Sequence, residues 1–441
     1  MRIIPKLSLT FVLAALFPLL TIGYAGMYFL GQLGERAIVT SRANAIESEK
    51  IRLQQLAADK ALIVQGFLSE YHRDVLLLQN QYERICSLTP LLENSFLRDV
   101  YADRDTAGLP GYGYVHPDYG AYGNWEKRGT LGGFWLRRSL VEKVRADQAF
   151  RKDASDTFSR LAALMPLMHS IYDKHQKSCD LVWIVTVAGM IGVYPDEYVD
   201  GVMQNAELAD LDESNEDYIR LYTSANDPTR EIRWMQPYLD VMKRIWMASC
   251  IAPLYQGDRF LGTLGADVAI EDLLEWLRGL RIGVKGYAFL LSSSGVPLAI
   301  PSSETDDLVK SPLLRQALRE AAKPTAKQSW TKELETAMQG SILDNAPREL
   351  TALYSRMIEQ KSGVELIAFP GEKKIVAYCP VGEAGLSVGI VMPVEESLSS
   401  LQPVLTGIDV TRAHYILSLI IFEASSPPRQ AVEQISPSWY F

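Results

Sequence analysis

The N-terminal part of the chain contains a long apolar segment. No charged residue falls between Lys6 and Glu35, and the residues between them are almost wholly apolar. A helix of about 24 residues rises about 36 Å, enough to cross the hydrocarbon core of a bilayer with some tilt. Since basic residues favour the cytoplasmic side, we predict a cytoplasmic N-terminus at 1–7, a transmembrane helix at 8–31 and the rest of the chain outside. A cleaved signal peptide is the alternative, but this segment is longer than the apolar core of most such peptides.

A helical pattern follows the apolar segment. Between residues 35 and 86 the sequence has no proline, and apolar residues recur at steps of three and four. This spacing is that of one face of an α-helix. We therefore predict a long stalk helix at 32–86, which packs against a core and also forms a homodimer. Its apolar stripe includes Phe67, Tyr71, Val75, Leu78, Tyr82 and Ile85.

Two later segments have the pattern of paired strands. Apolar, β-compatible runs at Met247–Tyr255 and Phe260–Ala269 flank Gly257, and an amphipathic helix follows them. A tight reversal requires a positive φ, which glycine adopts without strain. The run Leu181–Tyr194 is a second hairpin, turning near Gly189. These runs predict an antiparallel sheet.

A further set of strands begins near residue 283. The segment 283–303 contains two strand-like runs about a Ser-Ser-Gly turn, and three more runs lie at 363–369, 374–380 and 386–394. Helical, charged sequence fills 306–360 between them. This order predicts a second lobe with a sheet of its own.

The region between the stalk helix and the first hairpin is less regular, and we treat about 100–178 as an insert. Residues 101–135 are dense in glycine, tyrosine and aspartate and predict a loop-rich excursion. Residues 139–176 have a helical apolar face, which Pro166 is expected to kink or break. The acidic run Glu207–Asp217 is predicted to be exposed.

Composition and charge exclude several classes of function. The net charge of −9 is spread along the chain without a basic run, which is unfavourable for nucleic acid binding. The sequence has no zinc-protease, nucleophile-elbow, P-loop or dinucleotide motif, and its five histidines form no cluster. We therefore expect no enzyme activity, no metal and no cofactor. The four cysteines lack metal-ligand spacing. If the domain is exported, the sequence leaves open whether Cys86 and Cys179 form a disulfide.

The segment 231–274 carries a distinctive order of residues. Read along the chain, this order is Trp234, Pro237-Tyr238, Asp240, Ala252-Pro253, Gly262, Gly265 and Asp267. It resembles the core of the double Cache family, the extracytoplasmic ligand-binding domains of bacterial chemoreceptors and sensor kinases. The resemblance implies an α+β fold of two stacked PAS-like lobes, each built on an antiparallel sheet, beside a long helix.

The resemblance also divides the chain into regions. It implies a membrane-distal lobe at 87–281, which includes the insert, and a membrane-proximal lobe at 282–394. An exit helix and a short C-terminal tail would occupy 395–441, where the apolar run Tyr415–Phe422 is too short to cross a bilayer as a helix. We therefore expect a receptor that is truncated, or one that works through a separate cytoplasmic output protein.

Family members that bind amino acids or amines hold the two ends of the ligand differently. An arginine and a nearby aromatic residue bind the carboxylate, whereas a tyrosine and an aspartate bind the ammonium. Guanidinium groups and aromatic faces suit these two ends. The resemblance implies that ligand-binding positions here are Arg220, Tyr222, Tyr238 and Asp267, with Trp234 as a further candidate.

Structural roles for the same residues stay open. Asp267 is also placed to cap a turn or the next helix. Arg220 is also placed to pair with Asp217 or Glu216 on the surface, an interaction worth little. Trp234 and Tyr238 are expected to belong to the core in either case.

Taken together, these patterns predict a membrane-anchored sensor of a small molecule. The resemblance implies an amino acid, an amine or a small carboxylate as the ligand. The expected location is the bacterial inner membrane, with a single N-terminal pass and most of the chain periplasmic or extracellular. The alternative, which the short C-terminus favours, is a surface solute-binding protein that does not signal.

Overall fold

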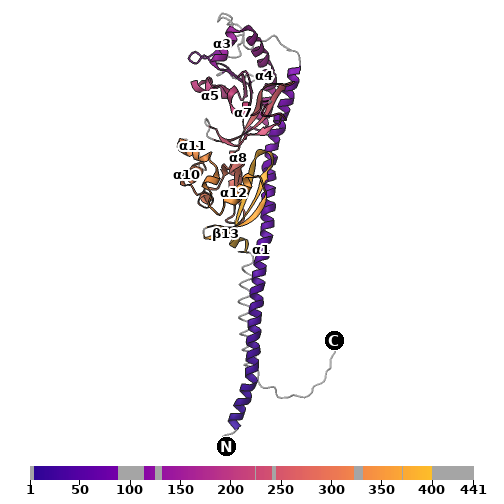
Figure 1. Ribbon diagram of the computed structural model, residues 1–441, viewed down its shortest axis with the longest axis vertical. Coiled ribbons are helices and arrows are strands. Elements are labelled where there is room, and N and C mark those ends of the chain that lie inside the picture. Colours follow the sequence, from indigo (N-terminus) through magenta and orange to yellow (C-terminus); the bar gives the residue numbers. More distant parts are fainter. Residues whose placement is uncertain are drawn as a thin grey trace, which may run out of the picture. The chain divides into compact units, whose positions relative to one another are not determined.

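The structure is a computed structural model of the 441-residue chain (Figure 1). It divides into two compact units, one formed by Met1–Lys50 with Pro393–Phe441 and the other by Ile51–Met392. Each unit is considered by itself below. The residues that the structure describes are 4–87, 114–124, 132–223, 225–240, 245–321, 331–369 and 371–399.

The first unit contains the start of helix α1 (Ile4–Ser87) and the short helix α13 (Val394–Ser397). Arg42 and Glu395 join these two helices through an exposed ion pair, which contributes little to stability. Among the described residues, no helix combines the length and apolar composition that a bilayer crossing requires. The transmembrane helix at 8–31 is therefore still a prediction without structural support. The predicted exit helix begins in α13, and its part beyond position 399, with the C-terminal tail, lies outside the described residues.

In the second unit, α1 packs along the rest of the chain through a stripe of buried residues. The stripe has steps of three and four, as the sequence predicted, because one face of the helix covers the core. A second set of large apolar residues on α1 is exposed. The buried residues include Leu53, Ala57, Val64, Leu68, Tyr71, Val75, Leu78 and Tyr82, and the exposed ones are Ile51, Leu62, Ile63, Leu76 and Leu77.

Within the described residues the larger sheet has nine antiparallel strands, and the two hairpins predicted for it are confirmed. Its longest pair, β8 and β9, reverses at Gly257, whose φ of +61° suits glycine. Three short strands, β1 to β3, lie in the region that the sequence predicted to be loop-rich. In sheet order the strands are β1 (Tyr114–Val115), β2 (Tyr122–Gly123), β3 (Gly133–Leu136), β5 (Ile191–Tyr194), β4 (Cys179–Thr186), β9 (Arg259–Ala269), β8 (Trp246–Gln256) and β6 (Arg233–Trp234), with β7 (Tyr238–Leu239) also beside β8.

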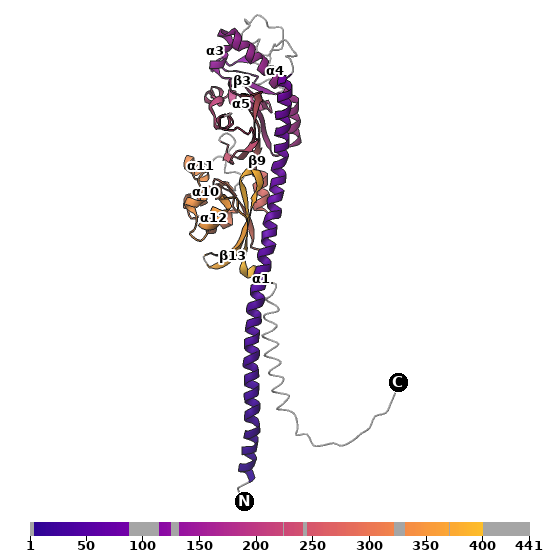
Figure 2. The same ribbon diagram turned by 45° about the vertical axis from the view of Figure 1, so that its right-hand side comes forward.

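Helices cover both faces of this sheet, and we call the sheet and its helices the first lobe. Helices α1 and α4 lie on one face (Figures 1 and 2). The other face is covered by shorter elements. These shorter elements are α5 (Glu197–Met203), α6 (Ala206–Ala209), the 3-10 turn η1 (Glu213–Asn215) and α7 (Asp217–Arg220). The short helix α3 (Arg138–Ala146) directly precedes α4 (Gln148–Lys174) in the chain.

The predicted break at Pro166 is wrong. The helical region 139–176 is instead divided at Asp147, whose carboxylate accepts hydrogen bonds from the N–H groups of Ala149 and Phe150 and so caps α4. Helix α4 continues through Pro166 because its buried face packs on the sheet on both sides of the proline, and such packing outweighs a local helix-breaking preference. The buried residues nearest the proline are Leu161, Ala162, Leu164, Met165 and Met168.

The second sheet has five strands and forms the second lobe with the helices beside it. Helix α8 (Glu271–Arg278) leads into it from the first lobe. In sheet order its strands are β11 (Pro297–Ala299), β10 (Tyr287–Ser292), β14 (Leu386–Pro393), β13 (Glu372–Val381) and β12 (Gly363–Phe369). Its other elements are η2 (Ser302–Glu304), α9 (Thr305–Leu308), α10 (Pro312–Ala321), α11 (Lys332–Met338), η4 (Ile342–Asn345), α12 (Thr351–Ile358) and η5 (Gly382–Ala384).

The predicted α+β fold, with two antiparallel sheets and a long N-terminal helix, is thus confirmed. The cysteines do not contribute a crosslink to it. Cys86, Cys179, Cys250 and Cys379 are free thiols, so the disulfide that the sequence left open between Cys86 and Cys179 is not formed.

Candidate functional site

The first lobe contains a cavity of about 320 Å³ between the larger sheet and the elements α5 to α7. Pockets that bind small molecules have volumes from about 300 to 1,000 Å³ and combine apolar walls with a few placed polar groups. The sheet wall of this cavity consists of Trp135, Leu181, Trp183, Val185, Ile191, Val193, Tyr238, Ser249 and Asp267, and the covering wall of Tyr198, Glu213, Glu216, Asp217 and Tyr218, with Met235 and Asp240 beside them.

Asp267 is the central polar group of the sheet wall. Its Oδ1 accepts a hydrogen bond from Trp183 Nε1 at 2.7 Å and another from Ser249 Oγ at 2.7 Å. The Tyr238 hydroxyl lies 3.0 Å from Ser249 Oγ. Because Ser249 has one hydroxyl proton and gives it to Asp267, Tyr238 is the donor to Ser249. Among the described residues no hydrogen bond reaches Oδ2 of Asp267, so this oxygen can accept one from a ligand.

The strand register explains how these groups meet. Asp267 on β9 lies directly opposite Ser249 on β8. Trp183 on β4 lies opposite Gly265, where a β-carbon would come within 2.8 Å of the indole ring. Glycine at this position therefore leaves room for the Trp183 ring to lie over β9 and reach the Asp267 carboxylate. The Trp183 ring also packs against Tyr218, with 5.1 Å between ring centres, so the two cavity walls touch there.

Two carboxyl groups of the cavity hold protons more tightly than usual. Burial raises the pKa of Asp267 to about 6, with Asp180 and Asp240 adding to the effect and the hydrogen bonds from Ser249 and Trp183 opposing it. Burial likewise raises the pKa of Glu213 to about 7, and the charges of Glu216, Asp267 and Asp212 add to it. The residues around the empty cavity thus do not fully stabilise the negative charges of these two carboxylates.

These pKa values predict that the empty protein loses stability as the pH rises. Both groups bind protons more readily in the folded chain than in the unfolded chain, where their pKa values lie near 4. The free energy of unfolding is therefore expected to fall as the pH rises from about 4 to about 7. Urea unfolding between these pH values measures the slope. In the variant Asp267→Asn with Glu213→Gln the slope should flatten, and an unchanged slope would contradict the assignment.

The structure brings two of the five predicted ligand residues into this cavity. Tyr238 and Asp267 line it, whereas Arg220, Tyr222 and Trp234 do not. Arg220 is exposed over 65% of its side chain and pairs with Asp217, the surface arrangement that the sequence left open. Tyr222 is buried, and its hydroxyl donates to the Arg233 carbonyl at 3.4 Å. Asp267 caps neither a turn nor a helix, since its bonds go to Trp183 and Ser249.

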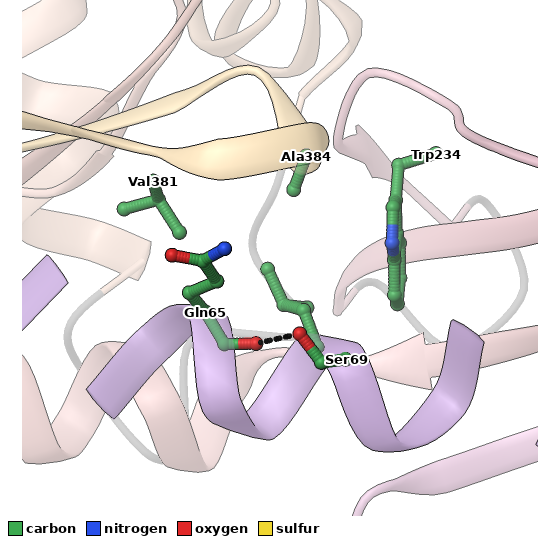
Figure 3. A pocket seen from close by; sticks show the side chains of 6 residues that line it. Gln65, Ser69, Trp234, Val381 and Ala384 are labelled. Atoms are coloured by element: carbon green, nitrogen blue, oxygen red, sulfur yellow. Dashed lines mark hydrogen bonds between the residues drawn. The ribbon is translucent and has the colours of Figure 1, made fainter. Parts of the chain in front are cut away.

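Trp234 lies where the two lobes and α1 meet. Its ring is 91% buried and packs edge-on against Tyr71 of α1, with 6.4 Å between ring centres. Figure 3 shows Trp234 beside a small pocket, with Gln65 and Ser69 of α1 facing Val381 and Ala384 of the second lobe. This pocket holds about 10 Å³, room for about one water molecule. Trp234 is therefore a packing residue of the joint between the lobes.

Comparisons with known proteins give distant matches. No family model matches the chain. Among curated proteins, the rat voltage-dependent calcium channel subunit alpha-2/delta-3 is 23% identical over 157 residues. This match covers 32% of the chain but only 14% of the channel subunit.

Two solved sensory domains align with most of the chain. The sensory domain of the Campylobacter jejuni chemoreceptor Tlp3 is 11% identical, with a TM-score of 0.44, and the match covers 81% of this chain and 98% of that one. The ligand-binding domain of the Pseudomonas aeruginosa PAO1 amino acid chemoreceptor PctB, in complex with L-Arg, is 16% identical, with a TM-score of 0.40 and coverage of 81% and 93%. The chain resembles double Cache sensory domains. The first of these is a sensory domain and the second a ligand-binding domain.

Several residues of the first-lobe cavity escaped the sequence analysis. The acidic run 207–217 was predicted to be exposed, which is wrong for Asp212, Glu213 and Glu216, because this segment folds back over the sheet and partly buries their side chains. Trp135 was not singled out because it ends a segment predicted to be loop-rich, and Trp183 was not because tryptophan in a strand run is more often core than ligand contact. The sequence did contain one signal for the acidic wall of the cavity, namely the run of carboxylates without basic residues just before Arg220.

Proposed function

We propose that the chain is the extracytoplasmic ligand-binding part of a membrane sensor, and that its ligand occupies the cavity of the first lobe. The observation that carries this proposal is the Asp267 carboxylate at the base of a partly aromatic cavity, with Oδ2 left for a ligand. A half-buried carboxylate without a cation is costly, and a bound ammonium group offsets that cost.

The expected ligand therefore carries an ammonium group, as an amine or an amino acid does. Its N–H donates to Asp267 Oδ2, and the rings of Trp183 and Tyr238 attract its charge through their faces. Ser249 fixes the carboxylate from behind, so that Asp267 is positioned before the ligand arrives. Tyr238 and Asp267 are the predicted ligand residues that this proposal retains as contacts.

Binding is proposed to reach the second lobe through the segment 234–238. Met235 and Tyr238 line the cavity, whereas Gln236 Nε2 donates to Ser293 Oγ of the second lobe at 2.8 Å. Trp234, at the start of the same segment, packs on α1. A ligand that draws Tyr238 inward thus acts on residues that also touch the second lobe and α1. The ligand shifts the equilibrium between two arrangements of these residues only by the difference in its affinity for the two arrangements.

Membrane anchoring through 8–31 and a periplasmic or extracellular location belong to the same proposal. Their support is the absence of charge between Lys6 and Glu35 in the sequence. A homodimer through the stalk helix, and a separate cytoplasmic output protein, complete it. Support for the dimer comes from α1, where large apolar side chains at Leu62, Ile63, Leu76 and Leu77 are exposed on the folded protomer.

The dimer predicts a specific crosslink. Leu62→Cys and Leu76→Cys are each expected to form a disulfide-linked dimer in membranes, because symmetry brings the same stalk position of two protomers together. Non-reducing gel electrophoresis measures it. Asp258→Cys, at the fully exposed turn between β8 and β9, serves as the control and should stay monomeric. Monomers at both stalk positions would contradict the dimer.

A thermal-shift screen of the full chain in detergent tests the proposed function. A ligand that binds only the folded state raises Tm with its concentration over Kd. The similar structures name L-isoleucine, L-valine, L-arginine, L-glutamine and GABA as ligands, and these five join simple amines in the panel. A rise in Tm with at least one ammonium compound, absent in Asp267→Asn, is the expected result. A rise only with compounds that lack an ammonium group would contradict the assignment.

A further inference from the structure

We propose that the ligand carries two positive charges, and that Glu213 and Glu216 form a second cation subsite opposite Asp267. This inference rests on the proposed function, because it names the ligand class of the same cavity. It adds a role for the covering wall, which the sequence resemblance does not assign.

The charge of the cavity lining is strongly one-sided. Five of its described residues carry carboxylates, and none is a lysine, arginine or histidine. Asp217 is neutralised by Arg220, outside the cavity. The side chains of Glu213 and Glu216 form no hydrogen bond or ion pair with any described residue, although Glu213 is half-buried. The five carboxylates are those of Glu213, Glu216, Asp217, Asp240 and Asp267.

The unpaired carboxylates lie on opposite walls. Asp267 belongs to β9 of the sheet wall, whereas Glu213 lies on η1 and Glu216 directly before α7, on the covering wall. One ammonium group bound at Asp267 would leave Glu213 and Glu216 with no counterion. A ligand with a positive charge at each end satisfies both walls, and charge-assisted hydrogen bonds at each end fix its orientation.

The second charge belongs to an organic group and not to a metal ion. Among the described residues, no three histidine, cysteine, aspartate or glutamate side chains come together as metal ligands do. Most of the other lining residues are instead aromatic or aliphatic, with Trp135 and Tyr198 at 6.2 Å between ring centres. Such walls suit the methylene chain of a diamine, whose charged ends would reach the two groups of carboxylates.

An α-amino acid fits the covering wall poorly. Its carboxylate would approach Glu213 and Glu216, and like charges disfavour each other strongly where water is excluded. Arg220, the residue that the sequence resemblance assigns to that carboxylate, is exposed and is engaged by Asp217. The lining of the cavity therefore favours a diamine over the amino acid that has the same carbon chain.

Three compounds of matched structure test the inference by calorimetry on the full chain in detergent. Butane-1,4-diamine carries both charges, butylamine lacks the second ammonium, and L-ornithine is the diamine with an added carboxylate. We expect the diamine to bind on the order of tenfold or more tightly than either of the other two. Glu213→Gln with Glu216→Gln should lower diamine affinity to the level of butylamine and leave butylamine affinity unchanged.

The outcomes separate this inference from the proposed function. Equal affinity for diamine and butylamine, or tighter binding of L-ornithine that Arg220→Ala abolishes, overturns the second subsite and leaves the ammonium site standing. Binding of none of the three also overturns the second subsite, whereas the ammonium site falls only if no ammonium compound of the thermal-shift panel raises Tm. Asp258→Asn, an exposed carboxylate outside the cavity, is the matched control and should bind all three as the parent chain does. Glutamine matches glutamate in size, so we expect the double variant to fold. Far-UV circular dichroism checks this.

Discussion

Asp267→Asn is expected to lower ligand affinity by about 30-fold to several thousand-fold while the protein stays folded. Removal of one partner of a buried charge pair costs about 2–5 kcal/mol of binding free energy, and each 1.4 kcal/mol is a factor of ten in Kd. Asparagine keeps an oxygen that accepts from Trp183 and Ser249, so the local hydrogen bonds survive. Calorimetric titration with the strongest ligand of the thermal-shift panel measures the change.

The stability of this variant provides the second half of the test. Because burial raises the pKa of the Asp267 carboxyl to about 6, its ionisation costs more free energy in the folded chain than in the unfolded chain. Loss of that charge should leave Tm unchanged or raise it. Asp258→Asn, an exposed carboxylate-to-amide change, should alter neither affinity nor Tm. Unchanged affinity in Asp267→Asn would remove Asp267 from the ligand site.

Trp234→Ala is expected to have the opposite effect, namely a large loss of stability with ligand affinity retained. Truncation of a buried tryptophan costs about 3–5 kcal/mol, because the transfer free energy of the ring and the cavity left behind add together. For a domain of this size we expect Tm to fall by on the order of 10 °C. Trp234 does not line the ligand cavity, so Kd should change little.

Two control variants sharpen the expectation for Trp234. Trp234→Phe retains an aromatic ring against Tyr71 and should recover part of the stability. Trp276→Ala removes a ring that is only partly buried and lies near the Lys60 ammonium, so its cost should be smaller. Thermal unfolding followed by circular dichroism compares all three. A Tm for Trp234→Ala equal to that of Trp276→Ala would show that the joint does not depend on Trp234.

The parts of the fold that were predictable from sequence are those set by local periodicity. The stripe on α1 and the hairpin of β8 and β9 repeat at the spacing of a helix and of paired strands, so neighbouring residues reveal them. The place of Asp267 in the cavity wall agrees with what the resemblance implied from the order of glycines and aromatic residues along that hairpin. Pro166 shows the limit of the approach, since packing of α4 on the sheet overrides a local preference.

The covering wall of the cavity was not predictable in the same way. Glu213 reaches the cavity only because η1 and α7 fold across a sheet whose strands come from distant parts of the sequence. The direction of Arg220 depends on α7, a helix of four residues that carries too few positions to show a periodic face. Side chains on short elements thus required the structure, whereas those on long strands did not.

The most direct test of the proposed function is hydrogen exchange of the full chain, measured by mass spectrometry with and without the ligand. The second lobe contains a cavity of about 300 Å³ with mixed charge, so the experiment must distinguish two places. The account predicts slower exchange in peptides that cover the first-lobe cavity at 181–185, 213–218 and 235–240. Slower exchange confined to 306–315 and 347–350, which line the second-lobe cavity, would contradict it.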